Sequence, residues 1–123
     1  ERGKRAGLGS QSYLNYDRYE GRWDSDRHDG FGTYTYHEEK KKYSGNWLEG
    51  HKHGQGTMET PEYVYKGDWE KGLMHGQGER VWKVGSSAWP NGAEYQGDFK
   101  KGTEHGKGVL RMQLPDIVWN KKL

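Results

Sequence analysis

Apolar and polar positions alternate with a period of two through most of the chain. Tyr43, Gly45 and Trp47 occupy every second position of one segment, so they share one face of an extended strand. A second alternating segment spans residues 54–58, and the linker between the two, residues 48–53, is polar and contains a glycine. Alternation on both sides of a short linker of this kind predicts a β-hairpin.

The hairpin pattern recurs as the phrase Tyr-x-Gly-x-Trp, a turn, and His-Gly-x-Gly. Successive copies begin at Tyr19, Tyr43, Tyr65 and Tyr95, at intervals of 24, 22 and 30 residues. Self-similarity at such a period indicates an array of one supersecondary unit. We assign a structural role to the repeat positions Tyr19, Gly21, Trp23, Tyr43, Gly45, Trp47, His53, Gly54, Gly56, Tyr65, Gly67, Trp69, His75, Gly76, Gly78, Tyr95, Gly97, Phe99, His105, Gly106 and Gly108.

A register for each hairpin follows from this phrase as a hypothesis. Pairing Trp47 with Gly54 sets Gly45 opposite Gly56, and sets Tyr43 opposite a methionine. An aromatic ring that lies over a glycine backbone restores packing that the glycine lacks. The intervening positions are mostly polar, so we expect a sheet with one aromatic face and one solvated face. Isolated hairpins are marginal in water, and stacking of neighbouring units must therefore stabilise the array.

Composition narrows the class of protein. Hydrophobic residues are 29% of the chain while aromatics alone are 14%, which favours a thin layer of rings over a thick aliphatic core. The 20 basic and 18 acidic side chains nearly balance, which argues against nucleic-acid binding. Cysteine is absent, which excludes cysteine-based metal sites, and no apolar run reaches the length of a membrane span. These features fit a cytoplasmic protein.

Departures from the phrase mark the array's organisation. Asp26 and Asp29 replace the usual glycine and histidine in the first full unit, and Trp89 lies in extra residues outside the pattern. The chain opens inside a repeat without an initiator methionine, so we expect a segment of a longer protein. We divide a single array, residues 1–123, into a partial unit 1–18, units at about 19–42, 43–64, 65–94 (with an insertion at 83–92) and 95–116, and a tail 117–123.

The phrase resembles the MORN repeat (membrane occupation and recognition nexus), and the resemblance covers nearly the whole chain. It implies an all-β fold in which tandem hairpins form one elongated, twisted antiparallel sheet with an aromatic-lined groove. Relatives of this kind include radial-spoke and other ciliary or flagellar proteins, proteins that join membranes, and segments attached to enzymes. The resemblance implies a protein–protein scaffold, sometimes with membrane association.

No catalytic constellation emerges from the residues. The recurring histidines occupy one position of each unit, which favours a structural role over metal binding. His28 and His37 lie off that position, and we interpret them as surface residues. The glycine motifs lack the lysine or third glycine of nucleotide-binding loops. We therefore expect no enzyme activity, no cofactor and no metal.

The aromatic and methionine residues at irregular positions have two candidate roles, contact with a partner or packing in the core. They are Tyr34, Tyr36, Met58, Trp82 and Trp89. Such residues are enriched at interface centres, and a partner helix could lie in the groove. The expected function is a non-enzymatic scaffold holding a partner segment in a multi-subunit assembly, such as a ciliary axoneme. The alternatives are a membrane-tethering or phospholipid-binding module, and a regulatory segment of a larger enzyme. Charges of mixed sign at the hairpin tips make the lipid alternative the weaker one.

Overall fold

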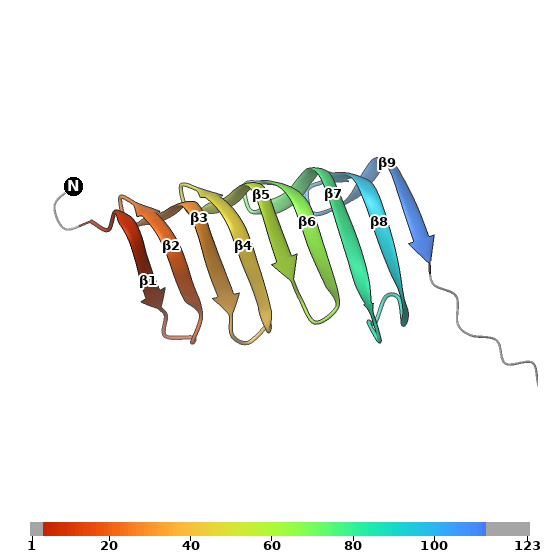
Figure 1. The fold of residues 1–123 in the computed structure, drawn as a ribbon, viewed down its shortest axis with the longest axis horizontal. Coiled ribbons are helices and arrows are strands. Elements are labelled where there is room, and N and C mark those ends of the chain that lie inside the picture. Colours follow the sequence, from red (N-terminus) through yellow and green to blue (C-terminus); the bar gives the residue numbers. More distant parts are fainter. Residues whose placement is uncertain (1–3, 113–123) are drawn as a thin grey trace, which may run out of the picture.

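The computed structural model describes residues 4–112, which form one open antiparallel sheet with no helix among them. The strands follow one another in chain order along the long axis of the molecule (Figure 1). They are β1 (Gly7–Ser12), β2 (Arg18–Asp24), β3 (Arg27–Tyr36), β4 (Lys41–Leu48), β5 (His51–Glu59), β6 (Tyr63–Glu70), β7 (Leu73–Val84), β8 (Asn91–Lys100) and β9 (Thr103–Met112). The predicted fold class, an elongated all-β array of tandem hairpins, is confirmed.

Each repeat hairpin closes with a two-residue turn, shorter than the linker predicted between residues 48 and 53. β4 runs to Leu48 and β5 begins at His51, so only Glu49 and Gly50 form the turn. Both have positive φ, 49° and 86°. Turns with positive φ at both central positions match the twist of hairpin strands. In the first full unit Asp26 takes the glycine's place with a φ of 64°, a conformation that aspartate tolerates better than most residues.

The predicted register is correct at the glycines and wrong at the tryptophan. Gly45 pairs with Gly56, as expected, but Trp47 pairs with Lys52 and not with Gly54. The ladder breaks between these pairs, where three residues of β5 lie opposite one residue of β4. Gly54 lies in this bulge with a φ of 70°. A bulge commonly places glycine in the left-handed conformation, which explains the first glycine of each His-Gly-x-Gly motif.

The tyrosine of each hairpin covers the second glycine of the motif. A Cβ atom added at Gly56 would overlap the hydroxyl and ring of Tyr43, and the other hairpins repeat this arrangement. The Tyr43 hydroxyl also donates a 2.8 Å hydrogen bond to the carbonyl of Asn46, the residue opposite the bulge. The predicted packing of rings over glycine backbone is therefore confirmed, and the same tyrosine satisfies a carbonyl at the ladder's break.

The core is a ladder of tyrosine and tryptophan rings that runs from one repeat to the next. Tyr43 meets Trp47 of its own strand and Trp69 of the next repeat edge-on, with ring centroids 5.2 and 5.1 Å apart. Edge-to-face rings at this distance are attractive beyond the area they bury. Buried members of the core are Tyr19, Trp23, Tyr43, Trp47, Met58, Tyr65, Trp69, Tyr95 and Phe99.

Candidate partner-binding groove

The ring-bearing face of the sheet, called the aromatic groove below, holds two pockets with different chemistry. One, of about 300 Å³, lies over the C-terminal strands and is lined by Trp82, Trp89, Tyr95, Glu104 and Leu110. The other, of about 190 Å³, is centred on the middle strands and contains a lysine ammonium among aromatic rings and methionines. Both are side-chain-sized recesses, and neither reaches far into the volume range of small-molecule sites.

One position in each hairpin places a different functional group in the aromatic groove. It lies in the strand after the turn, opposite the last aromatic residue of the phrase. Continuing the alternation backward by two residues from the bulge glycine reaches it. The position is occupied by His28, Lys52, Met74 and Glu104. The groove therefore presents an imidazole, an ammonium, a thioether and a carboxylate in order along its length.

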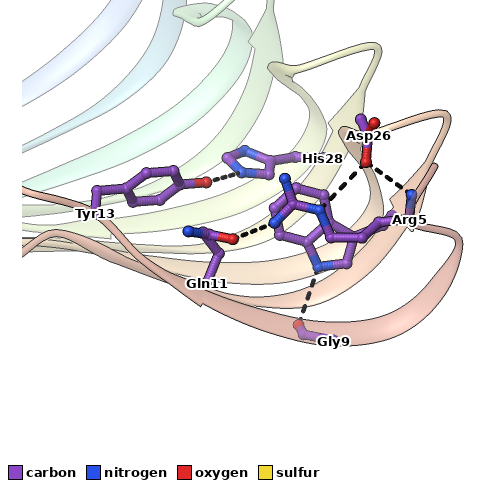
Figure 2. A network of polar contacts seen from close by, with 7 residues as sticks. Arg5, Gly9, Gln11, Tyr13, Asp26 and His28 are labelled. Carbon is purple, nitrogen blue, oxygen red and sulfur yellow. Dashed lines mark hydrogen bonds and ion pairs between the residues drawn. The ribbon is translucent and has the colours of Figure 1, made fainter. Parts of the chain in front are cut away.

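His28 lies inside the curve of the sheet, contrary to its interpretation as a surface residue. Its ring stacks on Tyr19 with centroids 3.8 Å apart, and it is hydrogen-bonded to the Tyr13 hydroxyl at 2.9 Å (Figure 2). Burial, together with the charge of Arg5, lowers the pKa of His28 to about 4. His28 is thus neutral at physiological pH, and it completes the aromatic core at this end of the array.

Arg5 closes the N-terminal end of the groove. Its guanidinium lies 4.2 Å from the ring centroid of Trp23, and its backbone N–H donates a 2.7 Å hydrogen bond to the Asp26 carboxylate (Figure 2). This backbone hydrogen bond, followed by one from the Arg5 side chain, holds the pKa of Asp26 below its usual value. Asp26, a departure from the repeat phrase, thus joins the turn to the segment that precedes β1.

Lys52 lies in the middle of the groove and points its ammonium among four rings. The Nζ atom is 5.2 Å from the ring centroid of Tyr36, and between 5.7 and 5.8 Å from those of Tyr43, Trp47 and Trp69. Burial, together with the charge of the neighbouring Lys41 and against the opposing effect of Glu39, lowers the pKa of Lys52 to about 8. Within residues 4–112 no carboxylate forms an ion pair with this ammonium.

Arg80 occupies the next part of the groove, and its charge is compensated. Its guanidinium forms a 3.3 Å ion pair with Glu104 and donates a 3.2 Å hydrogen bond to the carbonyl of Gly102. The same guanidinium lies 4.7 Å from the ring of Tyr63 and 5.2 Å from that of Trp82. The Arg80 side chain is only 11% exposed, whereas that of Glu104 is 33% exposed, so the guanidinium is the more desolvated partner of the pair.

The predicted partner-contact residues lie at three separate places along the groove. Tyr34 and Tyr36 form one pair, with ring centroids 4.4 Å apart, and Trp82 and Trp89 form another, 6.0 Å apart. Met58 is 5% exposed and belongs to the core beside Lys52. The Tyr34 hydroxyl donates to the buried Asp17 carboxylate at 2.8 Å, which fixes that ring in place. Trp82 and Trp89 are the members of this set that line the larger pocket.

The insertion that carries Trp89 is held by its own hydrogen bonds. The Ser86 hydroxyl donates to the Trp89 carbonyl at 2.8 Å, and the Ser87 N–H donates to the Glu62 carboxylate at 2.8 Å. Hydrogen bonds from the Ser87 side chain and from its backbone N–H lower the pKa of Glu62. Trp89 is thereby positioned over the C-terminal end of the aromatic groove.

The repeat histidines do not converge on one another. His53 and His105 are exposed, and His75 lies 3.5 Å from Glu70 across its hairpin. Residues 4–112 hold no cluster of three or more potential metal ligands among histidine and acidic side chains. Their predicted structural role stays a prediction. No helix in this range could span a bilayer.

An open sheet of repeated hairpins with a ring-lined groove defines a β-repeat interaction module. The family model of the MORN repeat matches residues 19–38, 43–62, 65–87 and 95–112. The chain belongs to the MORN-repeat family, whose repeats are non-enzymatic modules for contact with proteins or membranes. A search of curated proteins finds no match to the chain.

Proposed function

We propose that this chain is a non-enzymatic scaffold whose aromatic groove holds a segment of a partner protein within a larger assembly. The observation that carries the proposal is the pocket of about 300 Å³ formed by Trp82, Trp89, Tyr95 and Leu110 beside Glu104. Tryptophan side chains around a side-chain-sized recess are typical of interface anchor sites. A leucine or phenylalanine of the partner would fill the recess and bury apolar surface on both sides.

The supporting experiment places a photo-crosslinking amino acid at Trp89 and, as a matched control, at Phe31. Phe31 is 59% exposed on the opposite face of the sheet. In extracts of the source cells, the probe at Trp89 should form a covalent adduct with one protein that the probe at Phe31 does not capture. Substitution of Trp82 by alanine should weaken binding of that purified protein about tenfold or more, as expected for loss of an anchor residue. Equal capture from both faces would contradict the proposal.

The place of this scaffold in the cell follows from the family resemblance alone. We propose that it is cytoplasmic and that its assembly is a ciliary or flagellar axonemal structure such as a radial spoke. Imaging of the fluorescently tagged protein in ciliated cells tests this assignment. Axonemal fluorescence that survives detergent extraction is the expected result, and fluorescence confined to the cell body would contradict it.

A second function, binding of an anionic phospholipid, is favoured by a hollow of about 350 Å³ at one side of the sheet. Its lining includes His37, Lys40, Lys41, Lys42 and Lys83. Clustered basic side chains attract anionic lipid headgroups in a salt-dependent manner. Co-sedimentation with phosphatidylserine-containing vesicles, compared with phosphatidylcholine vesicles, tests this function. A charge-neutralising Lys40→Gln/Lys42→Gln variant should lose the difference.

A further inference from the structure

The functional groups in the groove differ in whether the chain itself supplies a hydrogen-bond or ion-pair partner for them. His28 is hydrogen-bonded to Tyr13, and Glu104 is paired with Arg80. Met74 carries no charge, and its sulfur lies 3.3 Å from an Arg80 guanidinium nitrogen. Lys52 alone in this series brings a charge that no oppositely charged group pairs within residues 4–112. Its ammonium is therefore the group in the groove with the most to gain from an anionic ligand.

The rings around Lys52 compensate its charge only in part. A cation gains less from an aromatic face than a desolvated ammonium loses when no anion lies beside it. The lowered pKa of Lys52 reflects this imbalance, because burial disfavours the charged form. An anion placed beside Nζ would restore the balance without any rearrangement of the rings.

The recess beside Lys52 fits one side chain. Its volume is about 190 Å³, and its lining includes Lys41, Met58, Trp69 and Met74 as well as Lys52. Two cations thus share a small recess whose other walls are mostly apolar and include no carboxylate. Lys41 is already paired with Glu39 at 3.2 Å, so the uncompensated charge is that of Lys52.

We propose that Lys52 receives the carboxylate of an aspartate or glutamate in an acidic partner segment that lies along the aromatic groove with apolar residues on either side. The proposal rests on the proposed scaffold function and specifies its partner's chemistry. The basic hollow at Lys40, Lys41 and Lys42 adjoins this recess through Lys41, so further acidic residues of the segment would meet complementary charge. The larger pocket, lined by Trp82 and Trp89, would take an apolar residue of the segment that flanks its acidic residue.

The test begins with selection from a display library of random peptides of about 16 residues, long enough to follow several strands. Selection is made in parallel against the intact protein and its Lys52→Met variant. Methionine is the residue that the equivalent position carries at Met74, so the variant should fold. Peptides selected on the intact protein should carry an acidic residue flanked by aromatic or aliphatic ones, and those selected on the variant should not.

The selected peptide is then measured by fluorescence anisotropy beside a version with each acidic residue changed to its amide. Lys52→Met should weaken binding of the acidic peptide about tenfold or more and leave the amide version unchanged, because only the acidic peptide loses a charge-assisted hydrogen bond. Lys66→Met is the matched control, since Lys66 is exposed on the opposite face. It should change binding less than about twofold.

The pH dependence of binding separates a charge at Lys52 from a structural role. Affinity for the acidic peptide should fall as pH rises from 7 to 9, because the free amine then loses its proton, and Lys52→Arg should remove this fall. The other titratable groups that face Lys52 are Tyr36, Glu39, Lys41, Tyr43 and Tyr63. A fall that persists in Lys52→Arg would assign the effect to one of them and overturn the proposal.

The outcomes distinguish this inference from the scaffold function. Selection of neutral peptides that bind the groove would overturn the role of Lys52 and leave the scaffold function standing. Selection of no peptide at all, together with binding of anionic vesicles, would overturn both in favour of the lipid function. Equal weakening of the acidic and amide peptides by Lys52→Met would show a packing effect and also overturn the inference.

Discussion

The indole N–H of Trp47 donates a 3.0 Å hydrogen bond to the carbonyl of Gly32, a residue of the preceding repeat. Trp69 makes the same 3.0 Å bond to Gly56. The donor and acceptor belong to neighbouring units, so each bond joins one hairpin to the one before it. Phe99 stands at the equivalent position of the last unit and has no such donor. The array is therefore joined by both ring contacts and polar bonds along most of its length.

Trp47→Phe should lower the free energy of unfolding by about 1–3 kcal/mol, since it leaves a buried carbonyl without its donor and removes part of a packed ring. Urea denaturation followed by fluorescence measures this change.

Hydrogen exchange of the indole protons supplies the control in the unaltered protein. The indoles of Trp23, Trp47 and Trp69 should exchange slowly, and those of Trp82 and Trp89, which make no hydrogen bond within residues 4–112, should exchange fast. Equal exchange rates would contradict the assignment.

Gly56→Ala should destabilise the sheet by more than about 2 kcal/mol, because its Cβ would displace the ring of Tyr43 from the core. Gly50→Ala is the matched control in the same hairpin. Nothing lies within 4 Å of a Cβ at Gly50, and only its φ of 86° opposes the change. That strain costs about 1–2 kcal/mol. Thermal unfolding of both variants should rank Gly56→Ala as the less stable, and the reverse order would refute the packing of rings over glycine.

The sequence pattern was sufficient for the hairpins and for the glycine register. Tyr43 and Gly45 alternate on one face, and glycine opposite glycine is the pairing that leaves room for the ring. The same pattern was not sufficient to predict the length of the turn or the position of the bulge. Trp47 pairs with Lys52 because the strand gains residues around Gly54, and alternation with period two looks the same with or without two extra residues.

The groove residue Lys52 was missed for the same reason. Lys52 was assigned to a hairpin tip because the linker was taken as too long, although backward alternation from Gly54 places it on the ring face. His28 was interpreted as a surface residue because it lies off the position of the repeat histidines, whereas its pairing with Trp23 places it on the ring face. What sequence cannot provide is the distance of Lys52 from its rings or the pairing of Arg80 with Glu104, because these depend on how adjacent repeats twist against each other.

Acidification should destabilise the protein through His28 before carboxylates contribute. The pKa of His28 in the folded state is about 4, below the value near 6.5 of an unfolded chain. The unfolded state therefore binds the proton first, and stability falls as pH drops from about 6.5 to about 4. The loss should be about 1–3 kcal/mol, with the upper end reduced by the partial exposure of the ring.

Thermal unfolding across this pH range measures the effect of His28. His28→Met provides the control, since the equivalent position in another repeat is Met74. The variant should keep a nearly constant midpoint between pH 6.5 and 4.5. The carboxylates whose pKa is held low by hydrogen bonds, such as Asp17 and Asp98, contribute only at lower pH, as their unfolded values are reached. A variant as pH-sensitive as the original chain would rule out His28 as the cause.

Breaking the Arg80–Glu104 pair should cost more than replacing it. Glu104→Met leaves a guanidinium that is 11% exposed without its carboxylate, and should destabilise the protein by about 1–3 kcal/mol. The double variant Arg80→Met/Glu104→Met replaces the pair with two thioethers beside Met74 and should recover most of this loss. A double-mutant cycle in urea measures the coupling energy. The ion pair of Arg111 on β9 with Glu94 on the neighbouring β8 is the exposed control, with side chains 65% and 44% exposed. Its coupling should stay below about 1 kcal/mol, since water screens an exposed pair. Coupling of equal size in the two cycles would mean that Arg80 is solvated in solution and that the groove is more open than the structure places it.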